Sequence, residues 1–222
     1  MSTANPPEVT ETCDLFTGET YLESLNDGRE IWYEGERVAN VAEHQAFANS
    51  ARSVASLYDA LHAPDTREQL TGVDQFGHRT HHFFKPSYCV ADLMASRDAI
   101  DVWQRMTYGW MGRTPDYKAA FMAQLAAGHD FYGDYADNAL AWYKTCASKC
   151  LFMNHVLVDP PVDRARPRDE VADVYVSADK DDDRGIYVSG AKMVATGSAI
   201  THATFVAVNS GIAARMQAGR DE

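Results

Sequence analysis

Residues 108–117 read Tyr108-Gly109-Trp110-Met111-Gly112-Arg113-Thr114-Pro115-Asp116-Tyr117, an aromatic run that leads into an arginine and a tyrosine. Thr114 is a favourable N-cap residue and Pro115 suits the first helical position, so the run predicts a helix that continues through residues 118–121. A guanidinium beside the unpaired N–H groups of a helix start favours an anionic oxygen. The same residues also suit a well-capped core helix in which Arg113 makes a structural salt bridge, and these ten residues leave both interpretations open.

On both sides of this run the sequence predicts a mainly helical first part. Hydrophobic residues recur three or four positions apart, which is the period of an α-helix, over 47–61 and again over 135–150. The other predicted elements are a short helix over 17–25, a hairpin over 30–38, a loop over 72–86 and a helix from 90 to about 110. His78, His81 and His82 fall in the predicted loop and are expected to be surface or pocket-rim residues.

After Asn154 the pattern changes from helices to strands and turns. Strands are predicted over 171–176, 186–190 and 204–208, with 192–195 extending the sheet and 179–185 forming an acidic turn. Three or four strands without a closing partner make a poor independent sheet. The predicted fold is therefore α+β, with a flexible tail over 1–16, a mainly helical domain over 17–153 and the first part of a β-domain over 154–222.

Composition restricts the class of partner. The formal net charge is −12 and no lysine or arginine cluster offsets it, which argues against nucleic-acid binding. The sequence has no apolar run of the roughly 20 residues that span a bilayer and no N-terminal signal-peptide pattern, so we expect a cytoplasmic protein. It also lacks the GxGxxG and GxxxxGK[ST] fingerprints, so a Rossmann turn is not expected to hold a flavin or nucleotide.

Three further features are candidates for chemistry. His155 lies where the helical part gives way to the strands, a common place for a pocket, although a histidine beside apolar residues is more often structural. The run from Ala195 to His202 is small and rich in hydroxyl groups, which lets a backbone approach a flat ligand. Cys146 and Cys150 share one helix face and suit half of an iron–sulfur site, but buried residues of a core stripe are the favoured interpretation, and no metal is expected.

Four motifs in the same order resemble the 4-hydroxyphenylacetate 3-monooxygenase family, specifically its flavin-using oxygenase component. They are residues 17–30 (Thr17-Gly18-Glu19-Thr20-Tyr21 through Glu30), residues 108–121, Asn154-His155 with Pro160-Pro161-Val162-Asp163-Arg164, and Val188-Ser189-Gly190-Ala191-Lys192 through Ala195-Thr196. The resemblance implies an acyl-CoA-dehydrogenase-like architecture, with an N-terminal helical domain, a middle β-barrel domain and a C-terminal helical bundle that also builds a homotetramer. Relatives are considerably longer, so we expect this chain to end inside the β-domain, before that bundle.

The resemblance also implies roles for individual residues. Arg113, Tyr117 and His155 correspond to the residues that surround the phenol oxygen of the substrate. The residues that correspond to the flavin-lining positions are His155, Val156, Leu157, Pro161, Val162, Asp163, Arg164 and Thr196.

The implied reaction is ortho-hydroxylation of a phenol, such as 4-hydroxyphenylacetate, to a catechol in aromatic catabolism. It uses O₂ and FAD as FADH2, which a separate flavin reductase delivers. Oxygen transfer to the ring is faster when the phenol is ionised, but the unperturbed pKa of a phenol is about 10. Lowering that pKa by about three units requires roughly 4 kcal/mol of preferential stabilisation of the anion, which a guanidinium, a histidine N–H and a tyrosine O–H in a dry pocket can supply.

Two alternatives remain open at this point. One is a partial or inactive fragment that binds no flavin and at most associates with other chains. The other is an enzyme like the FAD and iron–sulfur 4-hydroxybutyryl-CoA dehydratases, in which Cys146 and Cys150 would be cluster ligands.

Overall fold

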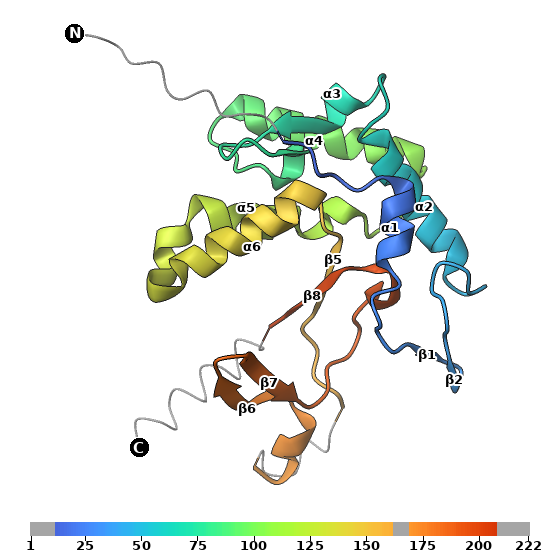
Figure 1. Ribbon diagram of the computed structural model, residues 1–222, viewed down its shortest axis with the longest axis vertical. Coiled ribbons are helices and arrows are strands. Elements are labelled where there is room, and N and C mark those ends of the chain that lie inside the picture. The colour runs from blue at the N-terminus through green and yellow to red at the C-terminus, as the bar shows by residue number, and fades with distance from the viewer. Residues whose placement is uncertain (1–11, 162–168, 208–222) are drawn as a thin grey trace. The chain divides into compact units, whose positions relative to one another are not determined.

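A computed structural model of the protein describes residues 12–161 and 169–207 (Figure 1). The chain divides into two compact units. The first unit is Met1–Met153 with Ala199–Ala203, and the second is Asn154–Ser198 with Thr204–Glu222. None of the helices in the described ranges is both long and apolar enough to cross a bilayer.

The first unit begins with a short capped helix, α1 (Gly18–Ser24), which confirms the helix predicted near residue 17. The Thr17 hydroxyl accepts a hydrogen bond from the backbone N–H of Thr20, and the Thr20 hydroxyl accepts one from Thr17 N–H, so the two residues cap the helix reciprocally. Gly18 allows α1 to approach α2 (Ala48–Ala60) closely, because a Cβ atom there would lie 2.6 Å from the Asp59 carboxylate and 2.8 Å from the Ala55 carbonyl. The predicted hairpin follows as β1 (Trp32–Tyr33) and β2 (Glu36–Arg37).

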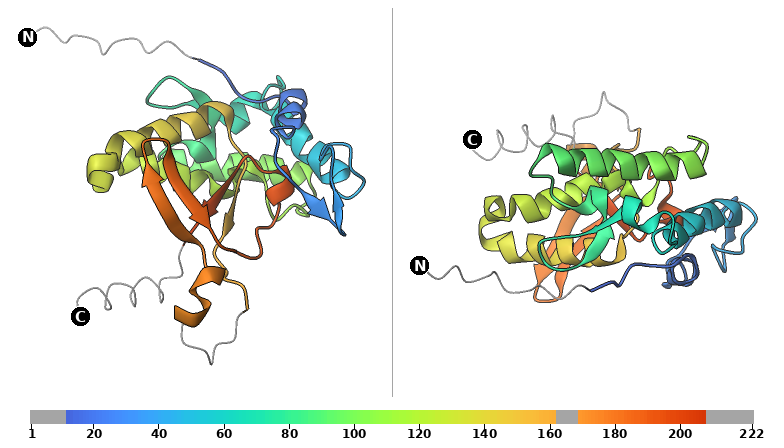
Figure 2. Two further views of the ribbon diagram at one scale, coloured as in Figure 1. Left: turned by 60° about the horizontal axis from the view of Figure 1, so that its bottom comes forward. Right: turned by 90° about the horizontal axis from the view of Figure 1, so that it is seen from above.

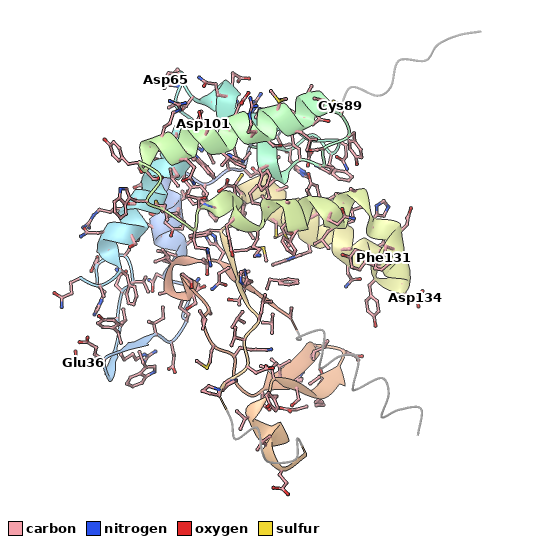
Figure 3. The ribbon with its side chains drawn as sticks, turned by 180° about the vertical axis from the view of Figure 1, so that it is seen from behind. Glu36, Asp65, Cys89, Asp101, Phe131 and Asp134 are labelled. Atoms are coloured by element: carbon pink, nitrogen blue, oxygen red, sulfur yellow. The ribbon has the colours of Figure 1, made fainter. Side chains whose placement is uncertain are left out.

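Five more α-helices supply most of the core of this unit. They are α2 (Ala48–Ala60), α3 (Arg67–Leu70), α4 (Val90–Met106), α5 (Ala119–Ala127) and α6 (Ala136–Lys149), with the short 3-10 helix η3 (His129–Tyr135) before α6. These bounds confirm the predicted helices near 47–61, 90–110 and 135–150. Figure 1 shows α5 and α6 side by side, and Figure 3 shows Phe131 and Asp134 at the turn that joins them. Trp103, Tyr58 and Tyr143 are fully buried, so each of the three long helices contributes an aromatic side chain to the core.

The prediction of a loop over 72–86 was wrong. The segment forms a hairpin of β3 (Thr71–Val73) and β4 (Arg79–His81), followed by the 3-10 helix η1 (His82–Phe84). The buried Asp74 carboxylate organises its turn by accepting hydrogen bonds from Phe76 N–H, His78 N–H and the Tyr143 hydroxyl at 2.9 Å each. The sequence pattern missed these strands because a distant tyrosine on α6 completes the turn.

His81 is also misplaced by the sequence prediction, since it is fully buried rather than at a surface or pocket rim. Its ring stacks on Trp103 with centroids 4.2 Å apart, and its Nδ1 accepts a hydrogen bond from Phe83 N–H at 3.1 Å. Burial, with a smaller contribution from His82, lowers the pKa of His81 to about 3. His81 is therefore a neutral member of the core.

Cys146 and Cys150 are both buried, which confirms that they belong to a core stripe. The Cys146 sulfur lies 3.8 Å from that of Met153, and the Cys150 sulfur accepts a hydrogen bond from His81 N–H at 3.2 Å. Burial raises the pKa of each thiol to about 12. In the described residues no group of three or more His, Cys, Asp or Glu side chains is placed to hold a metal ion.

The second unit contains short strands and 3-10 turns. Its elements are η4 (Asp169–Val174), β6 (Ser177–Asp182), β7 (Gly185–Ser189), most of β5 (Met153–Val156) and of β8 (Ala203–Val206), and the first residue of η5 (Ser198–Ile200). β5 pairs with β8, and β6 and β7 form an antiparallel hairpin, drawn as two orange arrows in the left view of Figure 2.

One strand prediction and one turn prediction in this unit were wrong. The alternating segment 171–176 is mostly the 3-10 helix η4, and the acidic segment 179–185 is not only a turn, because its first part belongs to β6. Pairing with β7 supplies the backbone hydrogen bonds that outweigh the low strand propensity of aspartate. The strands predicted near 186–190 and 204–208 are confirmed as β7 and β8.

His202 fastens the returning segment Ala199–Ala203 within the first unit. Its backbone N–H donates to the Phe152 carbonyl at 2.8 Å, while its Nδ1 accepts from Phe152 N–H at 2.9 Å. The neutral ring therefore carries its proton on Nε2, which lies 3.0 Å from the Ser24 hydroxyl. The ring also stacks on Phe16 with centroids 5.0 Å apart. Protonation of Nδ1 would remove the acceptor that Phe152 N–H requires.

This arrangement makes the first unit sensitive to acid. Burial and the positive charge of Arg29 lower the pKa of His202 to about 4, with a further lowering by Lys149 and an opposing contribution from Asp27. Because this pKa is below the unfolded value of about 6.5, the stabilisation is complete above pH 6.5 and is lost as the pH falls toward 4. Between pH 7 and pH 5 the wild-type chain is expected to lose about 2 kcal/mol more free energy of unfolding than His202→Asn.

Urea denaturation at the two pH values, followed by circular dichroism, measures this difference. Asparagine keeps an acceptor near the position of Nδ1 but does not titrate, so it isolates the ionisation of His202. His62→Asn, at an exposed histidine of the same unit, is the matched control. Equal pH dependence of the wild-type chain and His202→Asn would contradict the prediction.

Candidate phenol and flavin site

The run that contains Arg113 leaves the end of α4 through two residues in the left-handed region. Tyr108 has a φ of 53° and Gly109 a φ of 71°, and both Tyr108 and Trp110 are largely exposed. The chain then enters the 3-10 helix η2 (Pro115–Lys118), which continues directly into α5. Pro115 therefore occupies the predicted first helical position.

Thr114 occupies the N-cap position, but its side chain does not cap the helix. Its hydroxyl donates to the Asp116 carboxylate instead, and both residues are buried. The prediction of a side-chain cap was therefore wrong, because the buried carboxylate two residues later is the stronger acceptor. Burial raises the pKa of Asp116.

Arg113 and Tyr117 lie together, as the resemblance implied. The Arg113 guanidinium carbon is 4.2 Å from the centroid of the Tyr117 ring, within the range of a cation–π contact. The guanidinium also donates to the Gly112 carbonyl at 3.1 Å. Within residues 12–161 and 169–207, no carboxylate forms an ion pair with Arg113. The described residues therefore give the structural salt-bridge interpretation no support, and anion binding by Arg113 stays a prediction.

Lys118 was not among the predicted site residues. Lys118 is 8% exposed, and its ammonium nitrogen lies 4.6 Å from the Tyr117 ring centroid and 4.3 Å from the Phe121 ring centroid. Burial and the charge of Arg113 lower the pKa of Lys118. The sequence signal for Lys118 was its spacing, since it directly follows Tyr117 and precedes Phe121 by three positions on a helix. Helical spacing alone does not show where the flexible side chain of a lysine points.

The second unit holds the other predicted residues that the structure describes. In β5, Met153, Asn154 and Val156 are buried while His155 is half-buried. The Val156 carbonyl accepts a hydrogen bond from Ala207 N–H at 3.3 Å. Leu157 is 42% exposed and Pro161 is exposed. Of the predicted flavin-lining residues that the structure describes, Val156 is the most buried.

Asn154 fixes the backbone beside Thr196. Its side-chain nitrogen donates to the Ala195 and Thr196 carbonyls at 3.2 and 3.5 Å. These two acceptors set the orientation of the amide, which leaves Asn154 Oδ1 as a buried acceptor without a hydrogen-bond partner among the described atoms. Thr196 itself is exposed, and Gly197 has a φ of 83°, a conformation that glycine adopts without strain.

Residues that are close to Asn154 and Thr196 in the sequence carry exposed apolar side chains. Met193 N–H donates to the Val158 carbonyl at 2.8 Å, so the two segments pair there in an isolated β-bridge. Leu157, Val158, Met193 and Val194 are all between 38% and 66% exposed. Exposed apolar side chains beside a rigid polar backbone suit a flat aromatic ring with a polar edge, and the residues present therefore fit a flavin ring.

The three predicted residues Val162, Asp163 and Arg164 lie outside the described residues. Arg113 and Tyr117 belong to the first unit, whereas His155, Val156, Leu157, Pro161 and Thr196 belong to the second. A cavity of about 240 Å³ in the first unit, between Leu25 and Val41, contains none of these residues.

Comparison with known proteins gives one family. Residues 17–218 match the family model described as 4-hydroxyphenylacetate 3-hydroxylase N terminal. The chain is 54% identical over 171 residues to the pyoverdin chromophore biosynthetic protein PvcC of Pseudomonas aeruginosa, and 55% identical over 171 residues to the oxygenase component of 4-nitrophenol 2-monooxygenase of a Rhodococcus species. These matches cover 77% and 76% of this chain but only 34% and 33% of the relatives, so the chain spans about a third of their length.

Solved structures agree with the family match. The oxygenase component of 4-hydroxyphenylacetate 3-monooxygenase complexed with FAD matches with a TM-score of 0.79 at 33% identity, over 88% of this chain and 42% of that one. An archaeal 4-hydroxybutyryl-CoA dehydratase from N. maritimus matches with a TM-score of 0.70 at 22% identity, over 86% of this chain and 39% of that one. The second likeness shows a shared fold alone, and in this chain Cys146 and Cys150 are engaged in core contacts.

Proposed function

The chain belongs to the 4-hydroxyphenylacetate 3-hydroxylase family, and from this premise we propose that it is part of the oxygenase component of a two-component, FADH2-dependent aromatic monooxygenase. The observation in the structure that best supports this is the Arg113 guanidinium over the Tyr117 ring, without a carboxylate partner among the described residues. Such a cation is available to an anionic oxygen of a ligand. The proposed reaction is ortho-hydroxylation of a phenol to a catechol.

Arg113 has the chemistry to stabilise the substrate as its phenolate. A planar guanidinium offers several N–H donors and its charge persists throughout the physiological pH range. Tyr117 is held by its contact with Arg113, and its hydroxyl orients the phenol oxygen in this proposal. His155, which is half-buried on β5, supplies a ring N–H to the same anionic oxygen. These roles account for the roughly 4 kcal/mol that bringing a phenol pKa near neutrality requires.

Residues of the second unit would hold the cofactor. We assign the ring contact to His155, Val156, Leu157, Pro161 and Thr196, with Val162, Asp163 and Arg164 between them in the chain. When bound, reduced FAD would supply the two electrons that activate O₂, of which one oxygen atom is transferred to the phenol ring and the other leaves as water. Asn154 keeps the Ala195–Thr196 backbone in place through its two hydrogen bonds, and the exposed apolar side chains exclude water from the ring face.

The whole protein is proposed to work with other components. A separate flavin reductase would deliver FADH2, as the two-component organisation requires. We also propose an acyl-CoA-dehydrogenase-like architecture with a C-terminal helical bundle and a homotetrameric assembly. Relatives are named for different phenols, such as 4-nitrophenol and 4-hydroxyphenylacetate, so the proposal specifies the phenol class.

Flavin titration of the 222-residue chain tests this function. We expect anaerobic FADH2 to bind and to change the tryptophan fluorescence, and Thr196→Ala to weaken that binding by roughly threefold through the loss of one hydrogen bond. Thr145→Ala is the matched control, because the Thr145 hydroxyl donates only to the Ala141 carbonyl of its own helix. Failure of the chain to bind either FADH2 or FAD would contradict the flavin assignment and favour a fragment that binds no cofactor.

A further inference from the structure

We propose that Lys118 is the second cation of the phenol site, and that Lys118 and Arg113 together select the ionised form of the substrate. The inference rests on the function proposed above and deepens it, because it assigns the site to phenols in their anionic form. It concerns a residue to which neither the sequence motifs nor the family match gave a role.

The geometry places the two cations on one aromatic ring. The Arg113 guanidinium carbon lies 4.2 Å from the Tyr117 ring centroid, and the Lys118 ammonium nitrogen lies 4.6 Å from the same centroid. Lys118 is held further by Phe121, whose ring centroid is 4.3 Å from the ammonium nitrogen. An anionic oxygen beside Tyr117 is therefore within the field of both charges.

Neither cation has a neutralising carboxylate partner of the kind that several other basic residues of the chain have. Arg105 pairs with Asp101 at 2.7 Å and Lys192 pairs with Asp159 at 2.7 Å. In the part of the chain that the structure describes, neither Arg113 nor Lys118 has an ion pair with a carboxylate. Two neighbouring positive charges repel, and a bound anion would relieve that repulsion.

Asp116 does not serve as the missing partner, although it lies between the two residues in sequence. Its carboxylate accepts a hydrogen bond from the Thr114 hydroxyl, and both side chains are buried. Burial raises the pKa of Asp116, while burial and the charge of Arg113 lower the pKa of Lys118. Each pKa shift disfavours the charged form of its group, as expected for two groups that do not neutralise each other.

The surroundings favour an aromatic anion over a small inorganic one. Tyr117 is partly exposed and Phe121 is 50% exposed, so part of each aromatic side chain beside the cations is accessible to solvent. A phenolate places its oxygen near the charges and its ring against these aromatic side chains, which inorganic phosphate does not.

The apparent pKa of bound 4-nitrophenol tests the inference, because its phenol and phenolate forms absorb light differently. With the 222-residue chain, a pH titration of the absorbance gives this pKa, and a titration at fixed pH gives the affinity for the phenolate. We expect Lys118→Met to weaken phenolate binding about fivefold and to raise the apparent pKa of the bound phenol, because one nearby charge is lost. Lys118→Arg should retain both wild-type values.

Lys144→Met is the matched control, since the Lys144 ammonium nitrogen also lies 4.6 Å from an aromatic ring centroid, that of Phe76. It should bind 4-nitrophenol as the wild-type chain does. If Lys118→Met fails to fold, as circular dichroism would show, Lys118→Gln replaces it with the same expected loss.

The outcomes separate this inference from the proposed function. If Arg113→Met loses phenolate binding while the neutral Lys118 variants retain the wild-type affinity and pKa, the phenol site stands and the role of Lys118 is overturned. If the wild-type chain binds no 4-nitrophenol, both are overturned. Loss in the neutral Lys118 variants with recovery in Lys118→Arg supports the inference, because a merely structural lysine would not move the pKa of the ligand.

Discussion

Replacing Trp103 by alanine is expected to lower the free energy of unfolding by about 4 kcal/mol. Trp103 is fully buried on α4, and its indole N–H donates to the Leu57 carbonyl at 3.1 Å. Its ring stacks on His81 with centroids 4.2 Å apart. The alanine variant would leave a large cavity, an unpaired carbonyl and an imidazole without its stacking partner.

Urea denaturation monitored by circular dichroism measures this loss. Trp110→Ala is the matched control, because Trp110 is 89% exposed and an exposed substitution changes stability by about 0.5 kcal/mol or less. A loss below about 1 kcal/mol for Trp103→Ala would show that α4 does not pack as described.

Replacing Arg113 by methionine is expected to lower the affinity of the chain for a phenolate by roughly 50-fold, the effect of removing a charge-assisted hydrogen bond. Methionine retains much of the length of the side chain and can still cover the Tyr117 ring, so the loss reports the charge. The affinity is measured by titration with 4-nitrophenol above its solution pKa, where the ligand is ionised.

Arg105→Met is the control for this prediction, because Arg105 is an exposed arginine of α4 that pairs with Asp101. It is expected to retain the wild-type affinity. Tyr117→Phe should have a smaller effect than Arg113→Met, since it removes one neutral hydroxyl and keeps the ring. An unchanged phenolate affinity in Arg113→Met would exclude Arg113 from the site.

Elements that depend on local signals were predicted well. The capped helix α1 follows from Thr17, Gly18 and Thr20, and α2 and α6 follow from hydrophobic residues at helical spacing. The hairpin β3–β4 was missed because Tyr143, far along the chain, binds the Asp74 carboxylate that forms its turn. The acidic strand β6 was missed because its partner β7, and not its composition, makes it a strand.

The candidate site shows the same division. Arg113, Tyr117, His155 and Thr196 were identified from motifs, and their contribution to catalysis and cofactor binding stays a prediction. Lys118 and Asn154 were not identified, because their interest depends on neighbours. Lys118 matters through the rings of Tyr117 and Phe121, and Asn154 through two carbonyls about forty residues away in the chain.

The sequence by itself determined the family, the positions of the main helices and the identity of the arginine and tyrosine at the start of η2. These follow from the order of motifs and from local periodicity and turn chemistry, which neighbouring residues carry. Only the tertiary structure decided that His81 is a buried neutral histidine, that Thr114 does not cap its helix and that Arg113 and Lys118 have no carboxylate partner among the described residues. Burial and charge pairing depend on residues that approach from distant parts of the chain, and that proximity is a property of the folded protein.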